Sequence, residues 1–213
     1  MTARPAVTIA VVGVATDVGK TWIAAGLLAR LRASGTRVSA RKPVQSYAAG
    51  ATTTDAHFLG AATGEDPIAV CARHRWYPLA MAPPIAARRL GLAPIILPDL
   101  LDELTWPGGT EIGIVETVGG ARSPLADDAD SATFVRALEP DRVLLIADAG
   151  LGAINAVRLC ADTLAALAVT VVLNRFDRSD EVHQANCAWL ADRDGLSVVT
   201  DLDECTTSVL RLV

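Results

Sequence analysis

The sequence has no long apolar run, few aromatic side chains and no excess of basic residues. No uncharged apolar stretch approaches the roughly 20 residues of a membrane-spanning helix. Residues 2–5 lack the charged, apolar and cleavable order of a signal peptide. The formal net charge of −5 gives no reason to expect a nucleic-acid or anionic-membrane partner. We therefore predict a cytoplasmic protein that binds neither nucleic acid nor membrane.

The four cysteines form no C-x-x-C pair, and none has metal-ligand spacing with the three histidines. Cysteines of this kind are typical of free, buried thiols in a reducing compartment. The histidines share no spacing with one another and are interpreted as surface or packing residues. The sequence therefore gives no reason to predict a disulfide framework or a Cys/His metal site.

Short apolar runs alternate with segments of helical periodicity throughout the chain. Hydrophobic residues make up 51% of the sequence and aromatic residues 4%, which suits buried parallel strands covered by Ala-rich helices. Strands are expected at 7–13, 37–41, 111–116, 142–147, 169–173 and 196–199, and the longer helices at 20–34, 55–62, 131–138, 153–167 and 181–192. This order predicts an α/β fold with a mostly parallel sheet and helices on both faces, in one domain of residues 1–213.

Two segments between these elements are expected to be irregular, namely residues 63–84 and a loop at 117–130 that is rich in Gly and Asp. The helix predicted from residue 20 places Ile23 and Leu27 on one apolar face. Trp22, just inside that helix, is expected to lie in the core. Ligands of such folds bind beyond the carboxyl ends of the strands, so the polar residues there are the candidates for a site.

The strongest motif is the segment Gly13–Thr21, which follows a strand and opens a helix. Backbone N–H groups of such a loop, together with the helix N-terminus, cradle phosphate oxygens. A simple glycine turn would not require Gly-Lys-Thr at the helix start. The motif predicts a three-layer, P-loop NTPase-like fold, although five residues rather than the usual four separate its glycines. The residues expected to bind the nucleotide through this loop are Gly13, Asp17, Val18, Gly19, Lys20 and Thr21.

The five-residue spacing and the sequence T-D-V-G-K-T resemble the loop of the dethiobiotin synthetase family. Further matches follow in order along the chain. Lys42–Ser46 is similar to that family's K-P-V-[QA]-[ST], and Glu116–Gly120 resembles its E-G-A-G-G. Leu151–Asn155 resembles the L-G-x-I-N turn, and Asn174 ends its strand as the family's base-recognising Asn does. The resemblance covers nearly the whole chain.

The resemblance implies an ATP-dependent ring closure. One amine of 7,8-diaminononanoate would react with CO₂ to give a carbamate, which ATP would phosphorylate. The second amine would attack the mixed anhydride, close the ureido ring and release phosphate, giving dethiobiotin and ADP. The implied cofactors are ATP and Mg²⁺, and the implied assembly is a homodimer.

Phosphoryl transfer to a carbamate brings anionic oxygens together, so catalysis depends on positioning and charge neutralisation. Lys20 and Lys42 are the expected cations, because they approach from two neighbouring strand ends. Thr16 and Ser46 are expected to donate hydrogen bonds to the carbamate or the γ-phosphate. The plain alternative for Lys42 is a surface lysine.

Mg²⁺ prefers oxygen ligands and keeps several waters. Thr21, Asp55 and Glu116 are the expected sources of those oxygens, and Glu116 would also count among the nucleotide-binding residues. Asp55 could instead cap a helix, and Glu116 could be a solvated charge at the end of a strand.

The candidate substrate-binding residues are Thr16, Asp17, Lys42, Ser46, Gly119, Gly120, Gly152 and Asn155. Asp17 could meet a substrate amine, and the glycines would let backbone N–H groups approach the substrate. By resemblance, Gly152 and Asn155 would bind the substrate carboxylate in the neighbouring subunit. A helix cap is the alternative for Asn155.

Three side chains add bulk near the proposed substrate site: Thr117 and Val118 replace a small Gly-Ala pair, and Tyr47 stands where the family commonly has Gly. They leave open a relative that acts on another amine or carboxylate. An ATPase switch of the partitioning type is a further alternative. Against that alternative, Val18 occupies the loop position where such switches usually carry a second lysine.

The base of the nucleotide is not fixed by the motifs. The segment Asn174–Asp177 is similar to the N-K-x-D motif with which GTPases read guanine. We prefer to interpret Asp177 as a turn residue or as a cap before the next helix. ATP is the expected nucleotide, and its discrimination against GTP or CTP stays open.

Overall fold

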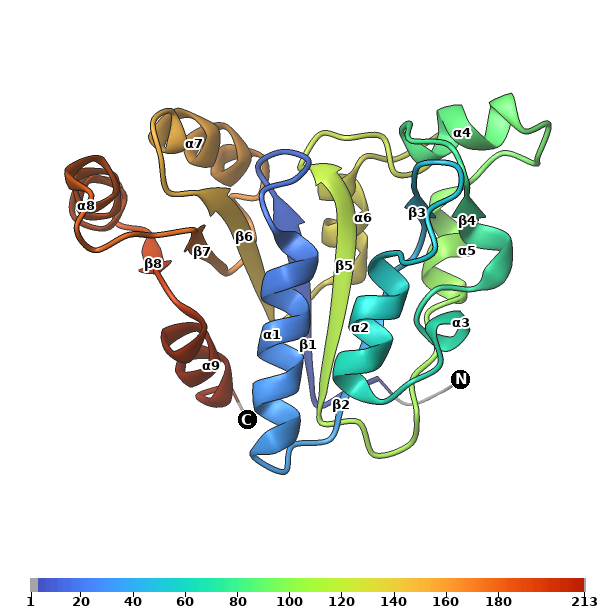
Figure 1. The fold of residues 1–213 in the computed structure, drawn as a ribbon, viewed down its shortest axis with the longest axis horizontal. Coiled ribbons are helices and arrows are strands. Elements are labelled where there is room, and N and C mark those ends of the chain that lie inside the picture. Colours follow the sequence, from blue (N-terminus) through green and yellow to red (C-terminus); the bar gives the residue numbers. More distant parts are fainter. Residues whose placement is uncertain (1–3, 213) are drawn as a thin grey trace.

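The fold is built on a six-stranded parallel sheet (Figure 1). It was obtained as a computed structural model, which describes residues 4–212. The strands lie in the order β2-β5-β1-β6-β7-β8, and every pair of neighbours is parallel, as the sequence predicts. They are β1 (Val7–Gly13), β2 (Val38–Arg41), β5 (Ile112–Gly120), β6 (Arg142–Asp148), β7 (Val169–Asn174) and β8 (Ser197–Val199).

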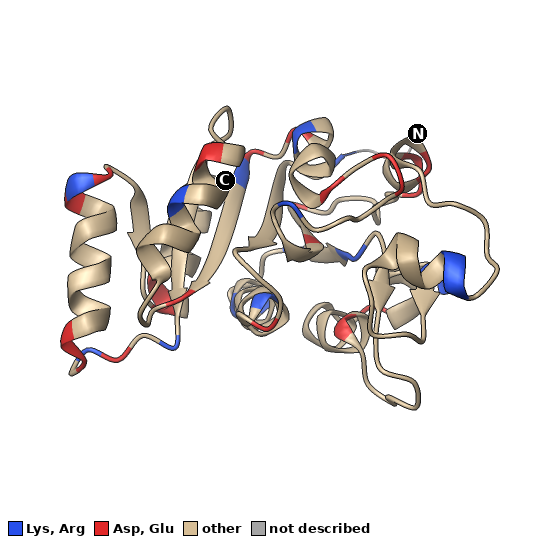
Figure 2. Cartoon of the chain, turned by 90° about the horizontal axis from the view of Figure 1, so that it is seen from above, with Lys and Arg blue, Asp and Glu red and all other residues tan. Residues whose placement is uncertain are grey.

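Helices connect successive strands. The longer ones are α1 (Lys20–Ala33), α2 (Asp55–Thr63), α6 (Ser131–Leu138), α7 (Ala153–Thr163), α8 (Glu181–Ala188) and α9 (Leu202–Leu210). The shorter ones are α3 (Pro67–Val70), the 3₁₀ turn η1 (Arg73–Arg75), α4 (Pro83–Arg89), α5 (Leu97–Asp102) and the π-helical turn η2 (Trp189–Arg193). None of the described helices is long and apolar enough to span a membrane. Figure 2 shows basic and acidic residues interspersed over these elements.

Side chains of each strand alternate between two hydrophobic cores, one on each face of the sheet. In β1, Ile9 and Val11 pack with α1, α2 and α9, whereas Ala10 and Val12 pack with residues of α4 to α7. Figure 1 shows α1, α2 and α9 together in front of the sheet. The predicted arrangement of helices on both faces is confirmed.

The prediction that Trp22 lies in the core is wrong. Its neighbour Ile23 is fully inside, with Leu27 and Leu31 one and two turns further along α1, whereas the Trp22 side chain is 62% exposed. Adjacent helical residues point about 100° apart, so one residue of offset moves a side chain out of the buried stripe.

Two segments are more regular than expected. Strand β5 continues to Gly120, because Gly120 pairs with Gly13 of β1 and the buried Thr117 donates its hydroxyl to the Val11 carbonyl. The stretch expected to be irregular contains α3, η1 and β4 (Trp76–Tyr77). Strand β4 forms a small parallel sheet with β3 (Gln45–Ser46), which the sequence analysis missed. Helix α7 ends at Thr163, earlier than predicted.

Candidate active site

A cavity of about 790 Å³ lies beyond the carboxyl ends of the strands. The loop after β1, the residue after β2, the end of β5 and the residue after β7 all contribute to its wall. The predicted site residues that line it are Thr16, Asp17, Gly19, Lys20, Thr21, Lys42, Ser46, Asp55, Glu116 and Gly119. The fold therefore brings most of the candidates together, as expected for strand ends that meet at one edge of a parallel sheet.

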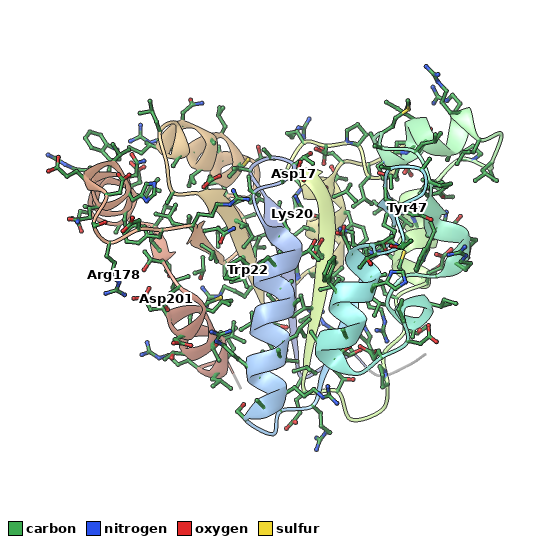
Figure 3. All side chains as sticks on the ribbon, in the orientation of Figure 1. Asp17, Lys20, Trp22, Tyr47, Arg178 and Asp201 are labelled. Atoms are coloured by element: carbon green, nitrogen blue, oxygen red, sulfur yellow. The ribbon has the colours of Figure 1, made fainter. Side chains whose placement is uncertain are left out.

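The loop between β1 and α1 is held by close contacts that leave no room for a side chain at its two glycines. A Cβ at Gly13 would lie 2.7 Å from the Ala15 carbonyl oxygen. Gly19 has a φ of 92°, and a Cβ there would collide with the Asn174 amide nitrogen. Lys20 folds over the loop and donates to the Ala15 carbonyl at 3.0 Å. Figure 3 shows Asp17 and Lys20 where the loop joins α1.

Asn174 and Val18 stabilise the loop through contacts within the protein and do not line the cavity. The Asn174 amide donates to the Val18 carbonyl at 2.9 Å, and both residues are buried. Asp177 accepts hydrogen bonds from the backbone and hydroxyl of Ser179. This geometry confirms the interpretation of Asp177 as a turn residue.

A cluster of charges surrounds the Lys42 ammonium. Its nitrogen lies 2.6 Å from Glu116 Oε1, 2.8 Å from Asp55 Oδ2 and 3.0 Å from the Thr117 carbonyl oxygen. Lys42 and Glu116 are both almost completely buried. The alternatives of a surface lysine at position 42 and of a solvated strand-end charge at Glu116 are therefore wrong.

Thr21 connects this cluster to the loop. Its hydroxyl lies 3.0 Å from Asp55 Oδ1 and 2.9 Å from Glu116 Oε1. Asp55 is the first residue of α2, but that helix is capped by the preceding Thr54 together with His57 of the first turn. The Asp55 carboxylate therefore faces the cavity instead of serving as the cap.

The environment moves the pKa values of the four charged groups in different directions. Burial and the neighbouring Lys42 lower the pKa of Lys20. Burial alone would lower the pKa of Lys42, but Asp55 and Glu116 outweigh it and raise that pKa. Lys42 lowers the pKa of Asp55, whereas burial raises the pKa of Glu116. The surroundings of Lys42 thus stabilise its charged form, whereas the surroundings of Lys20 destabilise its charged form.

These two cations are the only lysines in the chain. An amine-acylating reagent should therefore modify Lys20 at lower pH than Lys42, since only a neutral amine reacts and the lowered pKa of Lys20 frees its amine first. Peptide mass spectrometry over a pH series measures the order. Equal labelling of both lysines at every pH would contradict the assigned environments.

The oxygen-rich part of the cluster fits a magnesium ion. Glu116 Oε2 is buried and has no hydrogen-bond partner in the part of the chain that the structure describes, and it belongs to the carboxylate that already faces Thr21. Among the described residues, no group of three or more His, Cys, Asp or Glu could hold a metal. Two carboxylates and a hydroxyl nevertheless suit Mg²⁺, which takes phosphate and water oxygens for its remaining positions.

Gly119 and Gly120 pack against the phosphate loop. Gly119 has a φ of 57°, and a Cβ on Gly120 would lie 2.8 Å from the Val14 carbonyl oxygen. The Gly120 N–H donates to the Ser123 hydroxyl, so this donor is already satisfied within the chain. The positive φ of Gly119 and the close packing at Gly120 account for glycine at the two positions.

We expect Gly120→Ala to weaken nucleotide binding about tenfold, because the new methyl group must push the Val14 carbonyl and with it the loop. Isothermal titration with ATP measures the change. Gly108→Ala is the matched control, since a Cβ there meets nothing within 4 Å. Equal affinities of the two variants would show that the loop does not depend on this contact.

Two candidates lie away from the cavity. Gly152 and Asn155 are exposed at the start of α7, next to Leu151, whose side chain is 95% exposed. In a single chain, Gly152 and Asn155 therefore lie outside the cavity that the other candidates line or adjoin.

Of the three side chains expected to add bulk at the substrate site, only one lines the large cavity. Val118 lines the large cavity, but Thr117 is buried and bonded to β1. Tyr47 lines a separate cavity of about 420 Å³, where its ring packs edge-on against Trp76. The expectation that all three add bulk at the substrate site is wrong for Thr117 and Tyr47.

The sequence analysis missed several residues of the cavity wall. Arg175 follows β7, donates to the Asp17 carbonyl at 2.9 Å and pairs with Asp148. Both Asp17 and Arg175 have positive φ values, of 61° and 55°, a strained conformation that is frequent at functional sites. Ser123 and Trp22 also line the cavity. The position of Arg175 directly after a strand was the signal that could have identified it.

The fold and the site together define a P-loop NTPase. The glycine-rich loop connects β1 to α1 of a parallel sheet, a lysine and a threonine begin the helix, and a neighbouring strand supplies a carboxylate. A family model described as an AAA domain matches residues 7–205. The ATP-dependent dethiobiotin synthetase BioD of Haloferax mediterranei is 35% identical over 198 residues, covering 90% of this chain and 82% of that protein. The BioD of Xanthomonas campestris pv. campestris is 33% identical over 190 residues, covering 86% and 84%. This chain belongs to the dethiobiotin synthetase family.

Solved structures show the same fold at lower identity. A plasmid partition protein from Borrelia burgdorferi has a TM-score of 0.59 at 12% identity and covers 99% of this chain and 100% of its own. Chloroplast FtsY from Physcomitrella patens has a TM-score of 0.53 at 17% identity, covering 95% and 62%. At these identities the likeness concerns the fold alone, and it does not favour a partitioning switch.

Proposed function

We propose that this enzyme uses ATP to join CO₂ to 7,8-diaminononanoate and to close the ring of dethiobiotin. The observation that carries the proposal is the arrangement of Lys20 and Lys42 around the oxygens of Thr21, Asp55 and Glu116 in one cavity. Two cations and a magnesium site are what phosphoryl transfer between two anions requires. Membership of the family supplies the identity of the substrate.

The phosphate loop is proposed to hold the triphosphate. Backbone N–H groups of Asp17, Val18, Gly19 and Thr21 would face its oxygens at the start of α1. Lys20 would leave the Ala15 carbonyl and neutralise the transferred phosphate. Mg²⁺ held by Thr21, Asp55 and Glu116 would neutralise the charge that develops on the phosphate oxygens.

Lys42 and Ser46 are proposed to act on the substrate side. The amine nitrogen bonds to the carbon of CO₂ and loses a proton, and the carbamate oxygen attacks the γ-phosphorus with departure of ADP. The second amine then attacks the carbamate carbon and loses a proton to solvent, the carbon–oxygen bond to the phosphate breaks and phosphate leaves. Lys42, with Thr16 and Ser46 as hydrogen-bond donors, would bind the carbamate throughout. The Ser46 hydroxyl now donates to the Met81 carbonyl and would have to turn.

A homodimer is proposed to complete the substrate site. The exposed start of α7, with Gly152 and Asn155, would receive the substrate carboxylate beside the cavity of a second copy. Support comes from the exposed Leu151, an apolar side chain suited to an interface, and from the anion-binding tendency of a helix N-terminus. Residence in the cytoplasm stays a prediction.

The direct test is product formation. Purified protein is incubated with Mg-ATP, bicarbonate and 7,8-diaminononanoate, and dethiobiotin is detected by mass spectrometry while phosphate is measured. We expect product only when every component is present. Phosphate release that does not depend on the diamine, without product, would overturn the proposal in favour of an ATPase switch.

Asp55→Asn is expected to raise the Mg²⁺ concentration for half-maximal activity about tenfold, since an amide oxygen is a weaker partner for the ion than a carboxylate. A magnesium titration of turnover at saturating ATP measures this. Asp203→Asn is the control, because Asp203 pairs with Arg30 on the exposed side of α9. An unchanged titration for Asp55→Asn would remove Asp55 from the proposed metal ligands.

A further inference from the structure

Trp22 differs from the other tryptophans of this aromatic-poor chain in its surroundings. The other three tryptophans each contact an arginine guanidinium, and Trp76 also meets two aromatic rings. Within the described residues, Trp22 has neither kind of contact, and it is 62% exposed. It nevertheless lines the large cavity, directly after Lys20 and Thr21 of the phosphate loop. An exposed indole at this point has a large flat surface available to a ligand.

The order of the strands gives the cavity a direction. Lys42 follows β2 and Glu116 lies in β5, both on one side of the phosphate loop, and Arg175 follows β7 on the other side. In the proposed function the γ-phosphate reacts at the Lys42 cluster, which directs the ribose and base toward Arg175 at the other end of the cavity. In Figure 3, Trp22 lies on the side of α1 that faces Arg178 and Asp201, whereas Tyr47 lies on the opposite side.

We propose that the Trp22 ring is the stacking surface for the base of the bound nucleoside triphosphate. This inference rests on the nucleotide site of the proposed function. It assigns Trp22 to positioning the nucleotide and gives it no part in the chemistry. Stacking is tolerant of base identity because every base has a flat π face.

Two side chains that could contact the edge of a base each make hydrogen bonds within the chain. The Asn174 amide nitrogen is bonded to the Val18 carbonyl, and Asp177 is held in its turn by Ser179. Neither arrangement favours guanine recognition of the GTPase type. A site that relies on stacking should therefore accept ATP, GTP and CTP with similar affinity.

The test compares ligands with and without a base. In the full-length protein with Mg²⁺, we expect Trp22→Ala to raise the Kd for ATP, GTP and CTP about tenfold each. The Kd for inorganic tripolyphosphate should be unchanged, because the phosphate loop is intact. Trp22→Phe should keep most of the affinity for all three nucleotides. Trp189→Ala is the matched control, since Trp189 is 45% exposed on η2 and lies outside the cavity wall.

Intrinsic tryptophan fluorescence gives a second readout. ATP should quench the unaltered protein and not the Trp22→Phe variant, although that variant still binds ATP, and tripolyphosphate should quench neither. An unchanged ATP affinity in Trp22→Ala would overturn the stacking role while leaving the nucleotide site in place. Failure of the unaltered protein to bind either ATP or tripolyphosphate would overturn the proposed function itself, and the stacking role with it.

Discussion

Lys42→Met is expected to lower the rate of dethiobiotin formation about 10²–10³-fold, the usual effect of removing one charge-stabilising donor. The same change should reduce the free energy of unfolding by about 3–5 kcal/mol, because it leaves the buried Glu116 carboxylate without its cation. The methionine chain fills the same space as the lysine stem, so the loss reports charge rather than packing. Urea unfolding at neutral pH and a single-turnover assay measure the two effects.

A double variant separates charge from catalysis. Lys42→Met combined with Glu116→Gln removes both members of the buried pair, and we expect it to recover most of the lost stability without recovering product formation. If the double variant is as unstable as Lys42→Met alone, the destabilisation does not come from the unpaired carboxylate. The role of Lys42 as the cation that stabilises the buried Glu116 carboxylate would then be wrong.

The stability from Lys42 also has a defined pH range. Its pKa is raised in the folded protein above the ordinary value of 10.5, so its contribution is complete below that value and is lost only at higher pH. Asp55 behaves oppositely: its lowered pKa stabilises the protein above its ordinary pKa, and the contribution disappears in acid. The contributions of Lys42 and Asp55 are therefore both present from neutral to moderately alkaline pH.

Lys20→Met is expected to lower kcat/KM for ATP about 10²–10³-fold with little loss of stability. The contrast with Lys42 follows from the environment, since burial and the Lys42 charge both disfavour the Lys20 ammonium. Within residues 4–212 its nitrogen donates a hydrogen bond only to the Ala15 carbonyl. Steady-state kinetics and thermal unfolding measure the two quantities.

Lys20→Arg serves as the conservative comparison for that change. The planar guanidinium is wider than an ammonium and cannot occupy the same tight loop, so we expect it to be nearly as inactive as the methionine variant. Substantial activity in Lys20→Arg would show that any cation suffices there. A large loss of stability in Lys20→Met would instead mean that the lysine supports the fold.

Most residues of the candidate site, at the carboxyl ends of the strands, could be predicted from the sequence. The loop Gly13–Thr21 carries a local pattern, and polar residues after buried strands must converge because parallel strands end at one edge. Lys42 and Glu116 were identified in this way, although they lie 74 residues apart in the chain. Their burial in direct contact was not predictable, because it depends on β5 pairing between β1 and β2.

Other features depended on contacts between distant segments. The pairing of Gln45 with Trp76 leaves no periodic signal in two-residue strands. Val118 lies within the segment Glu116–Gly120 and Tyr47 directly follows the segment Lys42–Ser46, yet of the two only Val118 lines the large cavity. Trp22 is exposed because it lies one residue away from the buried stripe of α1. The apolar periodicity of α1 does not show whether a residue at the edge of that stripe is buried or exposed.

Oxygen tracing distinguishes activation of CO₂ as a phosphorylated carbamate at this site from simple hydrolysis of ATP. The enzyme is supplied with ¹⁸O-labelled CO₂, 7,8-diaminononanoate and Mg-ATP in a rapid reaction, and the released phosphate is analysed by mass spectrometry. We predict that phosphate carries one ¹⁸O atom from CO₂ for each dethiobiotin formed, because the carbon–oxygen bond breaks as the ring closes. Phosphate without ¹⁸O would mean that water cleaves ATP, and it would contradict the proposed reaction.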